Sequence, residues 1–290
     1  MKYFNEIFID KTKYGVKIQT GEYGKQGKHI IVDQGQNQIA GYTDREDGLF
    51  EEVPAIIFGD HTRVIKYIDQ PFFLGADGVK VLRSKDGNTD YKYLYYALKN
   101  VKIPNTGYNR HFKWLKESKI EYPDIKEQRK IVRILDKVSD IIQNRKRELS
   151  QLDDLVRARF VEMFGNCKNM ISMSELCSII TDGTHQPPKF QDTGIPFIFV
   201  SNLANNTVTY NAEKFISEEA YNELYKRTPI ETGDLLLSTV GSYGHPAVVV
   251  EDTKFLFQRH IAYLKPKKEL INSFYLHSAL LAPDCQRQIE

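Results

Sequence analysis

The most regular hydrophobic pattern of the chain lies near its middle, between residues 125 and 163. This segment contains neither glycine nor proline, and Asp124 and Glu127 at its start have the spacing of a capping box. Large apolar side chains recur there at every seventh position: Leu135, Ile142, Leu149, Val156 and Met163. The heptad repeat predicts one long helix with a coiled-coil-type apolar face, which we call the heptad seam. We expect Gly165 to end this helix in the left-handed conformation.

Short strand-like runs, separated by glycines, lie on both sides of this helix. Those before it are residues 29–32, 54–58, 62–68 and 79–83, and those after it are 196–200, 235–239, 247–250, 255–257 and 261–264. Apolar residues at helical spacing also predict a helix over 91–98, capped by Thr89 or Asp90, another capped by Ser217, and a third over 272–281. This order of elements predicts an α/β fold on each side of the long helix.

The two strand-rich parts repeat each other imperfectly. Gly59-Asp60 in the first part corresponds to Gly233-Asp234 in the second, 174 positions later, and Leu98 corresponds to Leu280, 182 positions later. Apolar strands and then a helix follow the Gly-Asp pair in both parts. The repeat predicts two related domains, and a chance agreement between two hydrophobic patterns is the alternative.

Length and composition narrow the class of protein. A chain of 290 residues has room for about two domains, and its 41% of hydrophobic residues can form cores without any run of about 18 apolar residues that could span a membrane. The first ten residues include acidic side chains and lack the apolar stretch of a secretory signal, so we expect a cytoplasmic protein. Cys167, Cys177 and Cys285 form no CxxC pair, which argues against a disulfide framework and a structural zinc site. A net charge of +2 does not by itself indicate a nucleic-acid binder, so any such surface must be local.

Motifs of catalytic sites do not fit the chain at the spacing that each requires. In residues 21–29 (GEYGKQGKH), five residues separate Gly21 from Gly27 where a phosphate loop has four, and His29 replaces the hydroxyl that binds magnesium. Residues 186–189 (QPPK) differ from the Asn/Asp-Pro-Pro-aromatic loop of amino-methyltransferases at the first and last positions. The seven histidines show no metal-ligand spacing such as HExxH. We therefore expect a chain that is not an enzyme and binds neither metal nor cofactor.

Hydroxyl, amide, basic and aromatic side chains gather instead in loops around glycines, in both parts of the chain. Such groups suit base edges and phosphates, so we take them as candidate DNA contacts. In the first part the candidates are Tyr42, Thr43, His61, Arg63, Asn105, Tyr108, Asn109, Arg110 and Lys113. In the second part they are Thr184, His185, Lys189, Ser242, Tyr243, His245, Gln258 and Arg259. Each loop alone also fits an ordinary solvated turn, and their occurrence in both parts favours DNA binding.

Several of these segments resemble the specificity subunit (HsdS) of type I restriction-modification systems. The long helix carries the strongest resemblance, in YPDIKEQRKIVRILDK at residues 122–137 and in LVRARFVEMFG at 155–165. DGTHQPPKF at 182–190, GIPFIFVSNL at 194–203 and FQRHIAYLKP at 257–266 are similar to the target-recognition domains of that family. IAGYTD at 39–44 and FGDHTRVIKYIDQPFF at 58–73 are similar to another version of those domains, so the resemblance covers nearly the whole chain.

The resemblance implies a mixed α+β protein with two target-recognition domains joined by a long coiled-coil-type helix. It places the first domain at 1–124, the conserved helix, as spacer and methyltransferase docking segment, at 125–165, and the second domain at 166–290. It further implies a non-catalytic subunit that binds double-stranded DNA at a bipartite site. The chain would thereby direct to that site the adenine methylation and cleavage that partner methyltransferase (HsdM) and restriction (HsdR) subunits carry out. S-adenosylmethionine, ATP and magnesium are expected on those partner subunits and not on this chain.

One departure from the family pattern leaves alternatives open. No second long helix follows the second domain in this sequence, so the heptad seam has no intrachain partner and the chain resembles a C-terminally truncated subunit. We expect the seam to pair with a second copy, with another truncated chain or with a methyltransferase subunit. A truncated chain could instead be inactive, as an interaction fragment or a store of recognition domains. It could also serve a related system in which methylation and cleavage share one polypeptide.

Overall fold

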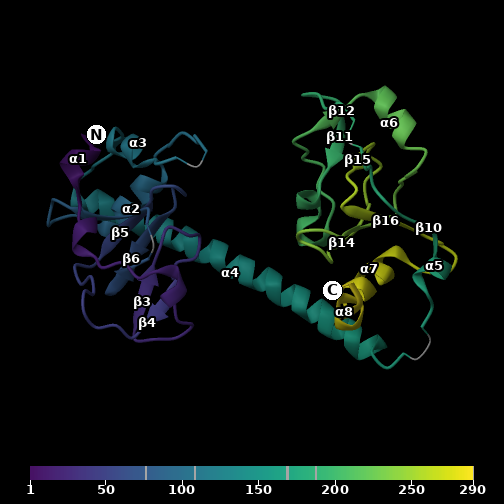
Figure 1. Ribbon diagram of the computed structural model, residues 1–290, viewed down its shortest axis with the longest axis horizontal. Coiled ribbons are helices and arrows are strands. Elements are labelled where there is room, and N and C mark those ends of the chain that lie inside the picture. Colours follow the sequence, from purple (N-terminus) through teal and green to yellow (C-terminus); the bar gives the residue numbers. More distant parts are fainter. Residues whose placement is uncertain (76, 108, 168–169, 187, 290) are drawn as a thin grey trace. The chain divides into compact units, whose positions relative to one another are not determined.

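A computed structural model describes residues 1–75, 77–107, 109–167, 170–186 and 188–289 (Figure 1). The chain divides into two compact units, Met1–Arg145 (unit 1) and Lys146–Glu290 (unit 2). The division falls inside the helix α4 (Ile125–Phe164), so each unit contains part of this helix.

Among its described residues, unit 1 has short strands, three α-helices and two 3-10 helices (η1 and η2) before α4. In chain order these are β1 (Lys2–Tyr3), α1 (Phe4–Ile7), β2 (Phe8–Asp10), η1 (Thr12–Tyr14), η2 (Thr20–Glu22), β3 (His29–Val32), β4 (Gly41–Thr43), β5 (Ala55–Gly59), β6 (Ile65–Ile68), β7 (Phe72–Leu74), β8 (Val79–Ser84), α2 (Tyr91–Lys99), α3 (Phe112–Lys116) and β9 (Lys119–Ile120).

Two sheets and a helix form the layers of unit 1. The strand order is β2-β8-β5-β6 in an antiparallel sheet and β4-β3-β7 in a smaller sheet, where β3 and β7 run parallel. Ile56 and Phe58 of β5 pack with Leu98 of α2, whereas Ile57 of the same strand packs with residues of the smaller sheet such as Phe72. Because β5 is buried on both faces, its sequence is apolar throughout and does not alternate.

Unit 2 contains a similar succession of elements. In chain order these are α5 (Met173–Leu176), β10 (Cys177–Asp182), β11 (Ile195–Ile198), η3 (Val200–Asn206), β12 (Phe215–Ile216), α6 (Glu218–Leu224), β13 (Leu235–Ser238), β14 (Pro246–Val248), β15 (Leu256–Phe257), β16 (Ile261–Pro266), α7 (Ser273–Leu281) and α8 (Pro283–Ile289). Its sheets have the orders β10-β16-β13-β14 and β12-β11-β15, and β11 runs parallel to β15.

The strand orders confirm the internal repeat and correct its alignment. β2-β8-β5-β6 and β4-β3-β7 of unit 1 become β10-β16-β13-β14 and β12-β11-β15 when each strand is replaced by its counterpart in chain order. The spacing of 182 positions is confirmed, because Leu98 and Leu280 are buried at the same place in α2 and α7, and Asp90 and Asn272 cap these helices with their side chains.

The match between the two Gly-Asp pairs is wrong. Gly59 ends β5, and the Asp60 carboxylate accepts a hydrogen bond of 2.8 Å from the Phe112 amide at the start of α3. Asp234 instead precedes β13, the counterpart of β5, where it binds the Tyr263 hydroxyl at 2.8 Å. The dipeptide misled the alignment because glycine and aspartate are common at either end of a strand.

The long helix is confirmed at the predicted place. The Asp124 carboxylate accepts hydrogen bonds from the amides of Lys126 and Glu127 at 2.9 and 3.0 Å, and the helix continues to Phe164. Gly165 does not take the expected left-handed conformation. Its amide donates to the Val161 carbonyl at 2.7 Å, in the ordinary pattern of an α-helix, so a left-handed residue is not needed to end it.

The heptad seam is largely uncovered in the described residues. Four of its members have relative exposures of 51–63%, namely Ile142, Leu149, Val156 and Met163, while Leu135 is half-buried. At the N-terminal part of α4, in unit 1, the Asp136 carboxylate binds Lys92 and Tyr96 of α2 at 2.7 Å each. In unit 2, the aromatic rings of Phe160 and Phe164 pack on Tyr275 of α7. None of the described helices is long and apolar enough to cross a membrane.

Candidate nucleic-acid interface

The turn between β5 and β6 meets the segment that leads into α3, both in unit 1. The buried His111 binds the Asp60 carbonyl twice, through its backbone amide at 2.8 Å and its Nδ1 at 3.0 Å. Arg63, which has a positive φ of 60°, reaches the Ile103 carbonyl with Nη1 at 3.4 Å. The predicted contacts His61 and Arg63 therefore lie beside the segment that carries Asn105, Asn109 and Arg110, whose side chains are exposed.

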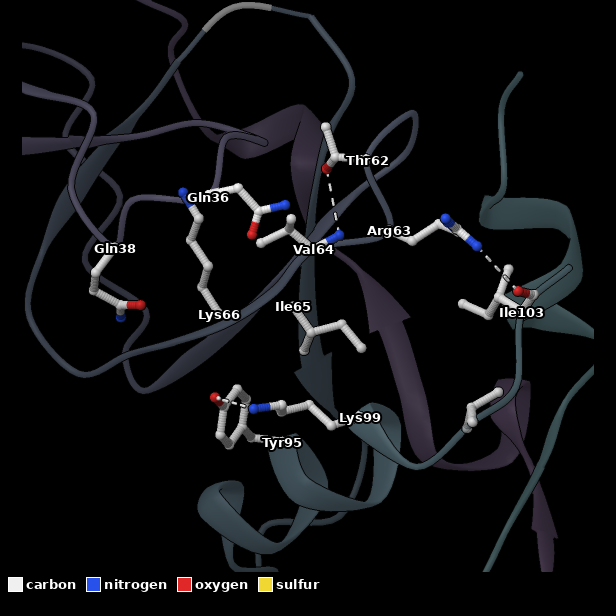
Figure 2. A pocket seen from close by; sticks show the side chains of 11 residues that line it. Gln36, Gln38, Thr62, Arg63, Val64, Ile65, Lys66, Tyr95, Lys99 and Ile103 are labelled. Atoms are coloured by element: carbon white, nitrogen blue, oxygen red, sulfur yellow. Dashed lines mark hydrogen bonds between the residues drawn. The ribbon is translucent and has the colours of Figure 1, made fainter. Parts of the chain in front are cut away.

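A cleft of about 560 Å³ opens beside this turn (Figure 2). It is lined by side chains from three segments of unit 1, which are the connection between β3 and β4, the β5–β6 hairpin, and α2 with the residues that follow it. Its polar members are Gln36, Gln38, Thr62, Arg63, Lys66, Tyr95 and Lys99. This volume lies within the range of ligand sites, and amides beside cations match the mixture of base edges and phosphates that DNA presents.

Lys66 is the most buried cation of the cleft. Its side chain is only 2% exposed, and its Nζ lies 3.3 Å from a carboxylate oxygen of Asp33. Burial lowers the pKa of the Lys66 ammonium by more than the neighbouring Asp33 carboxylate raises it. The Lys99 ammonium lies 3.3 Å from the Tyr95 hydroxyl and over the ring of that tyrosine, and Lys99 is exposed. The cleft therefore offers a solvent-accessible cation beside an internally paired one.

The remaining candidates of unit 1 lie elsewhere in it. Tyr42 and Thr43 belong to β4 in the smaller sheet, where Tyr42 exchanges backbone hydrogen bonds with Gly24. Lys113 is on α3, with its ammonium 4.8 Å from the centre of the Trp114 ring. Tyr108 lies outside the described residues. The structure thus groups some of the sequence candidates around the cleft and leaves others apart from it.

Two polar turns come together in unit 2, after β10 and after β15. The Thr184 amide donates to the Phe257 carbonyl at 2.9 Å, and the Arg259 amide donates to the Thr184 carbonyl at 3.1 Å. This arrangement places the predicted residues Thr184, His185, Gln258 and Arg259 in one region. A pocket of about 290 Å³ adjoins it, lined in part by His185 and by Arg227.

Two basic residues that line this pocket, His185 and Arg227, share one carboxylate beside it. Arg227 pairs with Asp182 at 2.6 Å, and His185 forms a hydrogen bond with the other oxygen of the same carboxylate. Burial raises the pKa of Asp182, but these two partners and a backbone hydrogen bond lower it by more, so that it lies below its ordinary value. Asp182 is therefore an anion at neutral pH and holds the cation of Arg227 at the pocket.

The β13–β14 turn of unit 2 forms a second polar cluster. His245 bonds through Nδ1 to the Asn206 amide oxygen at 3.0 Å and through Nε2 to the Ser242 hydroxyl at 3.0 Å. His277 of α7 lies 3.2 Å from the Asn206 carbonyl oxygen. Tyr243 is 48% exposed at the tip of this turn. Lys189, the last candidate, is exposed in the segment after β10.

Sequence reasoning missed several polar residues that the fold brings to these places. In unit 1 they are Gln36, Gln38, Lys66 and Lys99, and in unit 2 they are Asn206, Arg227 and His277. They lie on helices, on strand β6 and in connections, outside the polar turns around glycine that supplied the candidate contacts. The 182-residue repeat contained a usable signal, because it aligns Tyr95 of the cleft with His277. Within the described part of the chain, no three His, Cys, Asp or Glu side chains are grouped so as to hold a metal ion.

Comparisons with known proteins match one family. The family model for the type I restriction modification DNA specificity domain matches residues 4–153. The EcoR124I/EcoR124II specificity subunit of Escherichia coli is 27% identical over 228 residues, which are 72% of this chain and 56% of that protein. The EcoBI specificity subunit of Escherichia coli is 31% identical over 104 residues, or 36% of this chain and 22% of that protein. The chain thus spans about half the length of the first of these relatives.

Solved structures of the same kind of protein are also similar to the chain. The S subunit of a type I restriction-modification system from M. genitalium is 17% identical, with a TM-score of 0.49 over 99% of this chain and 78% of that one. The HsdS subunit from Thermoanaerobacter tengcongensis is 14% identical, with a TM-score of 0.35 over 96% and 76%. The family assignment rests on the sequence model, which covers just over half of the 290 residues, from α1 into α4. On this match, the chain belongs to the family of type I restriction-modification specificity subunits.

Proposed function

We propose that this chain recognises DNA sequence for a type I restriction-modification complex, and that each unit contacts one part of a bipartite site. The observation that supports it most is the duplicated topology, in which two units of the same strand order carry different polar side chains on their turns. A duplicated scaffold with different turn residues suits the recognition of two different short sequences, because base contacts come from side chains and the scaffold only positions them.

In this proposal the chemistry belongs to partner subunits. A methyltransferase subunit holds S-adenosylmethionine and methylates adenine, and a restriction subunit with ATP and magnesium cleaves the DNA. This chain selects the site at which they act. The two Escherichia coli relatives are specificity subunits of type I restriction enzymes, which supports the same division of labour here.

The heptad seam is the proposed docking surface for a partner. Four large apolar side chains at heptad spacing are more than half exposed. Full burial of such a side chain contributes about 1.5–3 kcal/mol. A complex in which a partner helix covers the seam is therefore stabilised by several such contributions. The partner is a helix of a methyltransferase subunit, of a second copy of this chain or of another specificity chain.

Mapping of DNA methylation tests the proposed function directly. The chain is expressed with the methyltransferase subunit of its own system in a host without other adenine methylation, and methyladenine is mapped across the genome. We expect one bipartite motif that is absent when either chain is omitted. Methylation without a motif, or the same motif without this chain, would contradict the proposal. A methyltransferase that copurifies with the chain but leaves no mark would instead support the alternative of an inactive interaction fragment.

A salt titration tests the proposed DNA contact of Arg259. This exposed arginine lies in the β15–β16 turn beside Thr184. If it neutralises one phosphate, Arg259→Ala weakens binding to all sequences and reduces the slope of log affinity against log salt by about 0.9. Lys226→Ala, which removes an exposed charge next to α6, is the matched control and should leave the slope unchanged. Equal slopes for both variants and the wild type would remove Arg259 from the interface.

A further inference from the structure

The cleft of unit 1 contains a polar side chain for which the described residues provide no partner. Gln36 lines the cleft from the connection between β3 and β4, and its side chain is exposed (Figure 2). Among the described residues, nothing forms a hydrogen bond with its amide group. An unused amide at the edge of a cleft is available to a ligand, and it offers one acceptor and two donors to it.

The neighbouring glutamines have structural roles, which makes Gln36 different from them. Gln34 donates to the Asp77 carbonyl at 3.0 Å and accepts from the His61 amide at 3.1 Å, so both ends of its amide are used. Gln38 donates to the Tyr67 carbonyl at 2.6 Å. The bonds of Gln34 with His61 and of Gln38 with Tyr67 fix the connection against the β5–β6 hairpin on both sides of Gln36. The backbone that carries Gln36 is therefore held in place while its own amide stays free.

The charges around Gln36 favour an anionic polymer. Arg63, Lys66 and Lys99 line the same cleft, and Asp33 pairs with Lys66. The other two cations, Arg63 and Lys99, form no ion pair with a carboxylate among the described residues. An anion that follows the cleft gains Coulomb energy from them, as the phosphates of a duplex do.

The corresponding place in unit 2 is also polar, although its residues differ. The segment after β11 corresponds to the segment after β3, and it brings Asn206 to the β13–β14 turn and to α7. The Asn206 side chain bonds to His245, and its backbone carbonyl lies 3.2 Å from Nε2 of His277, which aligns with Tyr95 of the cleft in unit 1. Each unit thus brings a side-chain amide from this connection to the neighbouring hairpin, Gln36 in unit 1 and Asn206 in unit 2. Recognition of two different sequences requires different polar groups at corresponding places, because base edges are read by hydrogen bonds.

We propose that Gln36 is a specificity-determining residue of unit 1, whose amide reads the edge of a base in the major groove while Lys99 contacts an adjoining phosphate. Adenine is the best match, because a glutamine amide can donate to its N7 and accept from its N6 amino group at the same time. This inference rests on the proposed function and goes further, since it names the side chain and the base class for one part of the site.

Methylome mapping with a matched pair of variants tests the role of Gln36. The full chain with its methyltransferase subunit carries either Gln36→Ala or Asn37→Ala, and methyladenine is mapped for each. Both side chains are exposed, so neither change removes an interaction of the fold, and only Gln36 lines the cleft. We expect Gln36→Ala to relax one position in one part of the motif and to leave the other part intact. Asn37→Ala should leave the whole motif unchanged.

Binding of synthetic duplexes gives the size of the effect. A duplex with the mapped site is compared with duplexes in which the base pair at the relaxed position is replaced. The wild-type complex should prefer the original pair by roughly 5- to 150-fold, the range expected for a bidentate contact, and Gln36→Ala should lose this preference. Lys99→Ala should weaken binding to all of these duplexes and lower the salt slope, whereas Lys102→Ala, a neighbouring exposed charge, should not.

The outcomes separate this inference from the proposed function. If the wild-type chain gives no motif at all, the proposed function fails. If the wild type gives a bipartite motif and Gln36→Ala gives the same motif with the same discrimination, only the assignment of Gln36 is overturned. A motif that changes in both parts at once would also overturn it, because a base contact from unit 1 alters a single part.

Discussion

Removal of two seam side chains should weaken assembly without weakening the fold. Leu149 and Val156 lie one heptad apart in the unit 2 part of α4, with relative exposures of 63% and 59%. Alanine at both positions retains the helix, since alanine has the highest helix propensity. The folded chain loses few contacts because both side chains are exposed. The double variant Leu149→Ala/Val156→Ala should therefore unfold at nearly the same temperature as the wild type.

The expected loss of binding free energy follows from the exposed fractions of the Leu149 and Val156 side chains. Full burial of a large aliphatic side chain is worth about 1.5–3 kcal/mol, and about three-fifths of each side chain is still available for burial by a partner. Each substitution then costs the complex about 1–2 kcal/mol, and the pair about 2–4 kcal/mol. At 1.4 kcal/mol for each factor of ten, the dissociation constant rises roughly 30- to 700-fold.

Sedimentation and a pull-down provide the assay. The purified chain is measured alone for self-association and then with the methyltransferase subunit of its system. The control is Ser150→Ala/Asp154→Ala, which changes two exposed polar positions of the same helix outside the heptad positions. A wild-type chain that is a stable monomer and binds no partner would refute the reasoning, and so would a seam variant that assembles as tightly as the control.

Two further predictions concern the stability of unit 1. Asp60→Ala leaves the buried amide of Phe112 without an acceptor, which should lower the free energy of unfolding by about 1–3 kcal/mol in urea, whereas Asp60→Asn keeps an acceptor oxygen and should lose less. Asp136 is half-buried, and its burial raises its pKa, but the hydrogen bonds from Lys92 and Tyr96 lower the pKa by more. A depressed pKa stabilises the fold above the unfolded value of about 4, and this contribution is lost as the pH falls through the folded value. The wild type should therefore lose more stability than Asp136→Asn on acidification below about pH 5, and parallel curves for the two proteins would contradict this assignment.

Local patterns in the sequence predicted the long helix, three shorter helices and nine strands, but they missed others such as the six-residue β10. The heptads predicted α4 almost to the residue. Capping residues, Thr89 or Asp90 and then Ser217, predicted the starts of α2 and α6, and the apolar spacing predicted α7 over 272–281. Some short elements escaped prediction, among them β9 and β12 with two residues each. Strands of this length carry too few residues for a hydrophobic period to be visible.

The candidate site was predicted in part. Turns rich in glycine and polar residues drew attention to His61, Arg63 and Arg259, and these lie on the two polar regions that the structure assembles. Gln36 and Lys99 went unnoticed because neither stands in a motif, and they line one cleft only after the β3–β4 connection folds against the hairpin and α2. Contacts between segments that are far apart in sequence leave no local signature.

The sequence by itself determined the long helix, its apolar seam, the existence of a repeat and the resemblance to a family, because each depends on the order of residues within a short window or on a regular spacing. Only the tertiary structure decided how the two copies correspond, since strand order and register are set by hydrogen bonds between distant strands and not by a shared Gly-Asp pair. It also decided which polar side chains are used within the fold and which remain free. Gln34 and Gln36 are the same residue type, two positions apart. In the folded unit the Gln34 amide is fully hydrogen-bonded, whereas the Gln36 amide faces the cleft without a hydrogen bond from the described residues.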